Sequence, residues 1–259
     1  MESSRSSDAS AQPTGLDGAL VAFGNLVFRY RNGLAPVLLA IVLLLTRPYQ
    51  FGGSARTDAV WDLAGVLVAF TGQALRILVI GLAYIQRGGK NRTIAADKLV
   101  VDGIFAHARH PLYVGNFLLL TGLMMIWNSP GGYAMLALAG LALFSMARAE
   151  ELFLSRKFGP AFDEYCARVP RFIPNLRGLG ATLSRFSFDW KRVVRKEYGT
   201  TFAFASCVVA LIALQWIEWE GMDGFVHALK VLLPVWIAIV LVWAAARWMK
   251  KTGRLRSPD

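Results

Sequence analysis

The chain has 259 residues, of which 55% are hydrophobic and only 17% are charged, and its formal net charge is +11. Soluble domains carry about 25% charged residues, so this composition excludes an ordinary soluble protein. The surplus of cations does not indicate a nucleic-acid binder, whose basic residues line a soluble face, and two cysteines exclude a disulfide scaffold. A very apolar chain with surplus cations indicates a bacterial-type membrane protein that crosses the bilayer several times.

Six apolar segments approach or exceed the roughly 20 residues of helix that cross a bilayer. In chain order the predicted spans are 33–49, with a start as early as 26, then 60–85, 111–127, 133–147, 200–216 and 226–248. The turn residues of 128–132 (Asn-Ser-Pro-Gly-Gly) join the third and fourth spans in a tight hairpin. The sequence therefore predicts an all-α polytopic membrane protein with about six transmembrane helices.

The predicted spans divide the chain into regions of different character. These are a disordered tail (1–25), the first span and its loop (26–59), a core (60–175), a basic amphipathic segment (176–199), and two additional spans with a basic tail (200–259). Within the amphipathic segment, the apolar and basic side chains of 184–199 fall on opposite sides of a helix, which is typical of a helix lying at the membrane surface. A simple basic anchor beside the membrane is the alternative.

The distribution of charge orients these spans. Cations are concentrated in 86–110, in 148–199 and in the C-terminal tail, whereas the loops 128–132 and 217–224 contain none. Because cytoplasmic loops are rich in Lys and Arg, we expect an inner-membrane protein with both termini in the cytoplasm.

Two polar clusters are the candidates for chemistry, because the chain contains none of the common motifs of soluble cofactor sites or metalloproteases. Arg109-His-Pro-Leu-Tyr-Val-Gly115 opens the third span, and the pair Glu150-Glu151 follows the fourth. From His110 to Trp127 the helix rises about 25 Å, and from Tyr133 to Glu150 the next helix descends by about the same distance. The hairpin thus returns the acids to the depth of the Arg-His-Pro cluster, where ionisable groups suggest a functional site. Ordinary surface ion pairs are the alternative.

Two further arginines are candidate substrate-binding residues. Arg76 lies inside the second span, on the same helix face as Gln73 and Asp62, and an arginine buried in a span usually has a partner. We predict that it binds an acidic group of the substrate or supports the acid pair; a structural pair with Asp62, or snorkelling, is the alternative. Arg171 lies in the Pro-bracketed segment 169–174, which either closes over a bound cofactor or forms a plain surface loop.

The Arg-His-Pro-x-Tyr-x-Gly motif of 109–115, followed by Glu150-Glu151, resembles the signature of the isoprenylcysteine carboxyl methyltransferase and phospholipid methyltransferase superfamily. Phe158-Gly159 and Val169-Pro-Arg-Phe-Ile-Pro174 match the segment that follows the acids in that superfamily, so the resemblance covers about 60–175. It implies an integral-membrane methyltransferase that uses S-adenosyl-L-methionine. The expected acceptor is a carboxylate or amine of a lipid or other apolar small-molecule substrate at the cytoplasmic leaflet.

The resemblance also implies roles for individual residues. A catalytic role falls to Arg109, Glu150 and Glu151, and cofactor contacts fall to His110, Pro111, Tyr113, Gly115, Glu150 and Glu151. Arg76 and Arg171 stay the candidate substrate residues on the grounds given above. A carboxylate can accept hydrogen bonds from ribose hydroxyls, and an aromatic ring offers a flat face to adenine. Which glutamate performs which task stays open.

Other functions also stay open. A membrane reductase of the sterol-reductase type has a similar Arg-His-Pro-x-Tyr segment and uses NADPH, and a non-catalytic membrane module or transporter would keep the same scaffold. The two additional spans would wall the substrate cavity, form a contact in a homo-oligomer, or only anchor the chain. We expect no bound metal, because His107, His110 and His227 are not spaced as metal ligands beside a suitable carboxylate.

Overall fold

The computed structural model describes residues 14–82, 94–185 and 187–255, which form helices and no strand. The longer helices are α1 (Gly15–Leu45), α2 (Ala55–Leu82), α3 (Pro111–Trp127), α4 (Pro130–Phe158), α7 (Trp190–Glu220) and α8 (Met222–Lys251). The shorter elements are η2 (Phe51–Gly53), η3 (Gly103–Ala106), α5 (Pro160–Arg168) and α6 (Leu179–Arg185). The all-α prediction is confirmed for the described residues.

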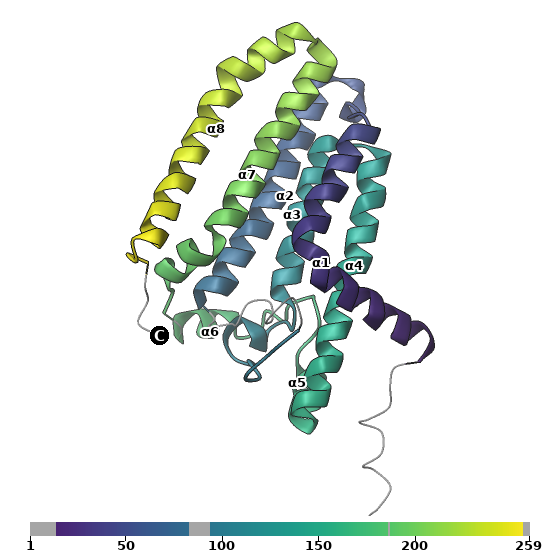
Figure 1. The fold of residues 1–259 in the computed structure, drawn as a ribbon, viewed down its shortest axis with the longest axis vertical. Helices are drawn as coiled ribbons and strands as arrows, with labels where there is room; N and C mark the ends of the chain where they lie inside the picture. The colour runs from purple at the N-terminus through teal and green to yellow at the C-terminus, as the bar shows by residue number, and fades with distance from the viewer. Residues whose placement is uncertain (1–13, 83–93, 186, 256–259) are drawn as a thin grey trace, which may run out of the picture.

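The long helices lie side by side in one bundle (Figure 1). α2 packs on α3, α1 on α4, and α8 packs on α7 at the outer edge of the bundle. The short helices α5 and α6 gather at the lower end, together with the segment that leads into α3. Polar and irregular structure is therefore concentrated at one end of an apolar bundle.

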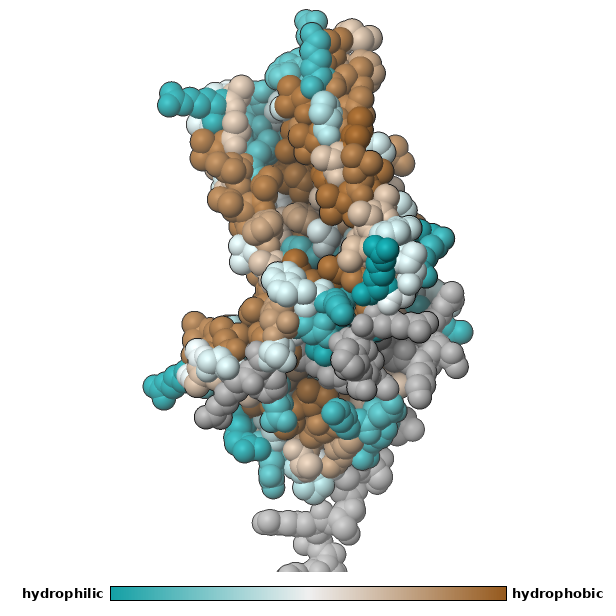
Figure 2. Space-filling model, turned by 90° about the vertical axis from the view of Figure 1, so that its left-hand side faces the viewer, coloured by the Kyte–Doolittle hydropathy of each residue, from teal (hydrophilic) through white to brown (hydrophobic). Residues whose placement is uncertain are grey.

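The surface of the bundle is that of a protein that crosses a membrane. Five of the described helices are long and apolar enough to span a bilayer, namely α1, α2, α4, α7 and α8, and α3 is a shorter apolar helix of 17 residues. Figure 2 shows apolar residues over much of the upper body of the molecule, with hydrophilic residues at its upper tip and toward its lower end. Because soluble proteins rarely expose so large an apolar surface to water, the chain is a multi-pass membrane protein.

The tight hairpin between the third and fourth spans is confirmed. α3 ends at Trp127, and Asn128 adopts the left-handed conformation (φ 41°) that commonly terminates a helix. Ser129 then caps α4 by accepting a hydrogen bond of 3.0 Å from the backbone N–H of Gly132. Pro130 occupies the first turn of α4, where its missing N–H has no cost.

Other helices are longer than their apolar segments predicted. α1 begins at Gly15, so residues 15–25, which we expected in a disordered tail, are helical. This helix contains Pro36 and bends along its length (Figure 1). Residues 190–199, expected in an interfacial segment, are the first turns of α7 and run without a break into the fifth span. Asp189 starts that helix by accepting a hydrogen bond of 2.8 Å from the backbone N–H of Arg192.

Glycines bring α2 and α3 into close contact. A Cβ placed on Gly72 would lie 2.6 Å from the carbonyl oxygen of Gly115, and one on Gly65 would lie 2.8 Å from the carbonyl oxygen of Gly122. Small residues allow helix backbones to approach in this way inside membranes. The contact fixes the start of α3, which carries the Arg-His-Pro motif, against the middle of α2.

Candidate active site

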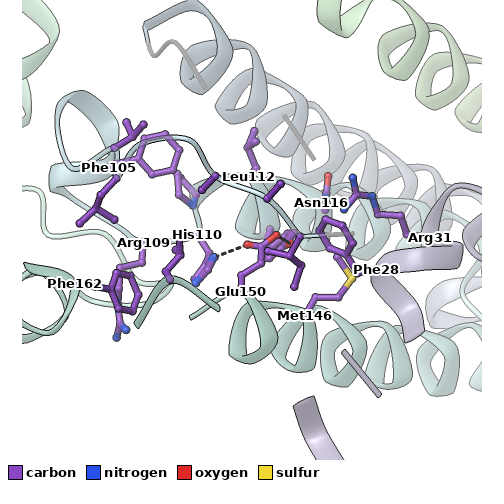
Figure 3. Close-up of a pocket in the computed structure, with 18 of the residues that line it drawn as sticks. Phe28, Arg31, Phe105, Arg109, His110, Leu112, Asn116, Met146, Glu150 and Phe162 are labelled. Atoms are coloured by element: carbon purple, nitrogen blue, oxygen red, sulfur yellow. Dashed lines mark hydrogen bonds and ion pairs between the residues drawn. The ribbon is translucent and has the colours of Figure 1, made fainter. Parts of the chain in front are cut away.

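A cavity of about 730 Å³ lies at the polar end of the bundle. Its wall combines side chains of α1, α2, α3, α4, α5 and α7 with the segments 94–100 and 105–110. Figure 3 shows the lining residues converging from the helices, with His110 and Glu150 pointing toward each other. Of the predicted site residues, the wall includes Arg76, Arg109, His110, Pro111, Tyr113 and Glu150, but not Gly115, Glu151 or Arg171.

Glu151 is the centre of a buried ion-pair cluster. Its carboxylate, of which 4% is exposed, accepts hydrogen bonds from Arg109 Nη1 at 2.9 Å and from Arg171 Nη2 at 2.6 Å. Arg171 Nε adds bonds of 2.9 and 3.1 Å to the two carboxylate oxygens, and His110 Nε2 lies 3.2 Å from Oε1. Such charge-assisted contacts are strong, and they join the motif before α3, the end of α4 and the segment after α5.

Glu150 faces the cavity instead. Its side chain is 25% exposed, and Tyr113 Oη donates a hydrogen bond of 2.6 Å to its Oε1. His110 Nδ1 lies 3.5 Å from Glu150 Oε2, and the rings of His110 and Tyr113 stack at a centroid distance of 5.5 Å. The two glutamates are therefore divided between two environments, with His110 in contact with both.

The position of His110 raises its affinity for a proton. Burial alone would lower the pKa of the imidazole, but the hydrogen bonds and negative charges of Glu150 and Glu151 outweigh burial and raise the pKa above its ordinary value. A protonated His110 donates to both carboxylates and holds them at fixed positions on the two sides of its ring.

The backbone around Arg171 explains where this arginine points. Arg109 N–H donates to Pro170 O at 2.9 Å, and His110 N–H donates to Arg171 O at 3.0 Å, so the two segments run together like a short ladder. His107 anchors the end of this pairing through Asn175, whose N–H donates to the His107 carbonyl at 2.9 Å. This pairing directs the Arg171 guanidinium onto Glu151, so it stands behind the cavity wall.

Gly115 and Arg76 also differ from the simplest expectation. A Cβ on Gly115 would lie 2.7 Å from Arg76 Cγ, so this glycine, which we expected to contact the cofactor, makes room for the neighbouring helix α2. Arg76 is paired with Glu197 of α7 and not with Asp62, and its Nη1 donates to Asn116 Oδ1. Glu197 had a visible signal in the sequence, because it is the one acid within the basic run 190–198. Asn116 had none.

Among the described residues, no group of three or more His, Cys, Asp or Glu side chains could hold a metal ion. The ionisable groups of the site are instead paired with one another, as the cluster around Glu151 shows. The cavity wall itself presents the carboxylate of Glu150 and the stacked rings of His110 and Tyr113.

A family model described as phospholipid methyltransferase matches residues 62–161, which contain the Arg-His-Pro motif and both glutamates. The chain is 34% identical over 178 residues to the cobalt-zinc-cadmium resistance protein CzcN of Cupriavidus metallidurans, a match that covers 65% of this chain and 75% of the relative. It is 32% identical over 170 residues to the nickel-cobalt-cadmium resistance protein NccN of Alcaligenes xylosoxydans, covering 65% of this chain and 72% of that protein.

A match to an enzyme of named activity is shorter. The protein-S-isoprenylcysteine O-methyltransferase of Schizosaccharomyces pombe is 34% identical over 99 residues, which cover 36% of this chain and 42% of the enzyme. No solved structure matches the chain.

Proposed function

The chain belongs to the isoprenylcysteine carboxyl methyltransferase and phospholipid methyltransferase superfamily, and from this premise we propose that it transfers the methyl group of S-adenosylmethionine to an acceptor in the membrane. The acceptor group is a carboxylate or an amine on a lipid or another apolar small molecule. The observation that carries the proposal is the cavity at the polar end of the bundle, where His110, Tyr113 and Glu150 share one wall.

The residues of this wall fit the cofactor. A volume of about 730 Å³ is within the range of roughly 300–1,000 Å³ of small-molecule sites. The Glu150 carboxylate can accept hydrogen bonds from hydroxyl groups, and the stacked rings of His110 and Tyr113 offer an edge and a face to an aromatic base. Pro111 fixes the start of α3, the helix that carries Tyr113 to the cavity wall.

The cofactor, when bound, supplies a methyl group on a positively charged sulfur, which a nucleophile displaces in line. The protein must therefore orient two molecules and exclude water, more than it must provide a strong acid. In this proposal Glu150 contacts the cofactor or acceptor, while Glu151, with Arg109 and Arg171, holds the Arg-His-Pro segment in place. An acceptor carboxylate arrives ionised and needs no base, whereas an acceptor amine must lose a proton, and Glu150 is the carboxylate that can take it.

We assign this end of the bundle to the cytoplasmic leaflet of the inner membrane, with both termini in the cytoplasm. Support comes from the cation-rich segments 148–185 and 250–255, which flank or follow helices that end there. A lipid acceptor would then approach from the same leaflet in which its headgroup lies.

Calorimetry on the purified protein in detergent tests the cofactor. We expect S-adenosylmethionine to bind and NADPH not to bind. Binding of NADPH alone would favour a membrane reductase and overturn the proposal, and binding of neither would favour a non-catalytic membrane module.

Methyl-labelled cofactor then tests the acceptor. A farnesylated cysteine presents a carboxylate, and phosphatidylethanolamine vesicles present an amine, so label in one or the other distinguishes O-methylation from N-methylation. Label in neither, with cofactor binding intact, would exclude both acceptors and direct the search to whole lipid extracts.

A further inference from the structure

One buried arginine joins three helices at the cavity wall. Arg76 of α2 and Glu197 of α7 have side chains that are only 4% and 2% exposed. Arg76 Nε donates to Glu197 Oε2 at 3.1 Å, and Arg76 Nη2 lies 3.1 Å from Oε1 and 3.0 Å from Oε2. The remaining nitrogen, Nη1, donates to Asn116 Oδ1 of α3. The guanidinium is therefore held from two sides at a fixed orientation.

The same three helices contribute to the wall of the candidate site. Arg76, Asn116 and Thr200 line the cavity together with Tyr113 and Glu150. Asn116 lies three residues after Tyr113 on one face of α3, a rise of about 4.5 Å. Figure 3 shows Asn116 on the lining of the cavity, farther along α3 than His110. A group that shifts Asn116 thus shifts the surface next to the Tyr113–Glu150 pair.

The pair with Glu197 is part of a polar network that stability alone does not explain. Gln73 Nε2 donates to Thr201 Oγ1 at 2.8 Å and lies 3.5 Å from Glu197 Oε2, while Gln73 Oε1 is buried without a hydrogen-bond partner. Replacing buried ion pairs by apolar side chains is often neutral or stabilising. A buried network of this kind has a free-energy cost, which is a reason to look for a function of the arrangement that it fixes.

Glu197 also changes the expected role of Arg76. Because a bidentate carboxylate neutralises its charge, Arg76 is poorly suited to be the direct counter-ion of an acidic acceptor. Arg76 instead holds the side chain of Asn116 in place on the cavity wall.

We propose that Glu197 is a positioning residue of the methyl-transfer site: it orients Arg76, which fixes Asn116 on the cavity wall beside the bound cofactor. Helix α7, which lies outside the matched residues 62–161, then contributes to the wall of the site and is not only an anchor. This inference rests on the proposed use of S-adenosylmethionine. It follows from the joining of α2, α3 and α7 by one guanidinium that lines the cavity together with its partner Asn116, while Glu197 holds it from outside the lining.

The test separates folding from positioning. Glu197→Gln leaves a buried arginine without its counter-charge, so the melting temperature of the ligand-free protein should fall, and S-adenosylmethionine should bind at least about tenfold more weakly by calorimetry. The double variant Arg76→Met/Glu197→Leu removes both charges and should recover the melting temperature, yet its cofactor binding should stay weak. Glu218→Gln is the matched control on the same helix, because Glu218 forms an ion pair with the exposed Arg47; it should change neither quantity.

A double variant that recovers both melting temperature and cofactor affinity would overturn the inference, since the pair would then be purely structural. Asn116→Ala decides the matter if the double variant does not fold. It leaves the ion pair intact, and it should weaken cofactor binding without a large fall in melting temperature; binding equal to wild type would overturn the inference. If the wild-type protein itself does not bind S-adenosylmethionine, the proposed function fails instead.

Discussion

Separate replacement of the two neighbouring glutamates should produce opposite defects. Glu151→Gln removes a charge that is 4% exposed and leaves Arg109 and Arg171, which are 15% and 28% exposed, without a counter-ion. Breaking a fully buried pair costs about 3–5 kcal/mol, and the partial exposure of the arginines reduces this to about 2–3 kcal/mol. For a chain of this size that corresponds to a fall in apparent Tm of about 5–10 °C.

Glu150→Gln should behave differently, because this side chain is 25% exposed and a glutamine oxygen can still accept from Tyr113. The expected loss of stability is below about 1 kcal/mol, whereas loss of the negative charge should weaken S-adenosylmethionine binding by about tenfold. Thermal unfolding in detergent and calorimetry measure the two quantities on the same samples. The assignment of a structural role to Glu151 and of a cofactor contact to Glu150 is wrong if Glu150→Gln lowers Tm more than Glu151→Gln does. It is also wrong if Glu150→Gln binds the cofactor like wild type.

Further predictions concern the wall of the cavity and its support. Gly115→Ala places a methyl group 2.7 Å from Arg76 Cγ and should cost about 1–3 kcal/mol in thermal unfolding, whereas Gly199→Ala, with nothing within 4 Å, should cause no loss. The pKa of His110 is raised in the folded protein, so its contribution to stability is present at low pH. This contribution is lost as the pH rises above about 6.5 and through the raised pKa. His110→Asn should flatten this profile of Tm against pH, and an unchanged profile would exclude His110 as its source. Tyr113→Phe removes the hydrogen bond to the cavity-facing glutamate and should weaken cofactor binding about tenfold in calorimetry; equal binding would remove Tyr113 from the site.

The α3–α4 hairpin was predictable because its signals are local. Pro111 and the turn at 128–132 mark the ends of α3, and its predicted and observed bounds agree. The rise from His110 to Trp127 equals the descent from Tyr133 to Glu150, which predicts that both glutamates lie at the level of His110. The structure confirms this, because His110 Nδ1 lies 3.5 Å from Glu150 Oε2 and His110 Nε2 lies 3.2 Å from Glu151 Oε1. A prediction that depends only on helix rise and turn position needs no knowledge of the rest of the bundle.

The division of labour between the glutamates could not be predicted in the same way. Successive residues on a helix point about 100° apart, so the two side chains meet different surroundings. Which one faces the cavity depends on the rotation of α4 about its axis. That rotation is set by packing against α1 and α3 and by the pairing of Arg171 with Glu151, which are long-range contacts.

The partner of Arg76 was missed for a related reason. Helical spacing within α2 drew attention to Asp62, but the structure pairs Asp62 with Gln215 at 3.4 Å and gives Arg76 to Glu197, 121 residues away. A buried arginine requires a counter-charge, and any helix that passes at the right depth can supply it. Composition predicts that such a partner exists, but only tertiary packing identifies it.

The acids of the site follow one physical rule. The chain has 17 Asp and Glu residues, and three of them, Glu150, Glu151 and Glu197, surround the same polar end of an apolar bundle. The side chains of Glu151 and Glu197 are nearly inaccessible to solvent, and each forms an ion pair with arginine. An unpaired buried charge would destabilise the folded protein. Of these three acids, Glu150 is the one that lines the cavity, with Tyr113 and His110 fixing its direction. A cationic sulfonium entering this cavity would therefore meet the oriented carboxylate of Glu150, and the neighbouring ion pairs would hold that carboxylate in place.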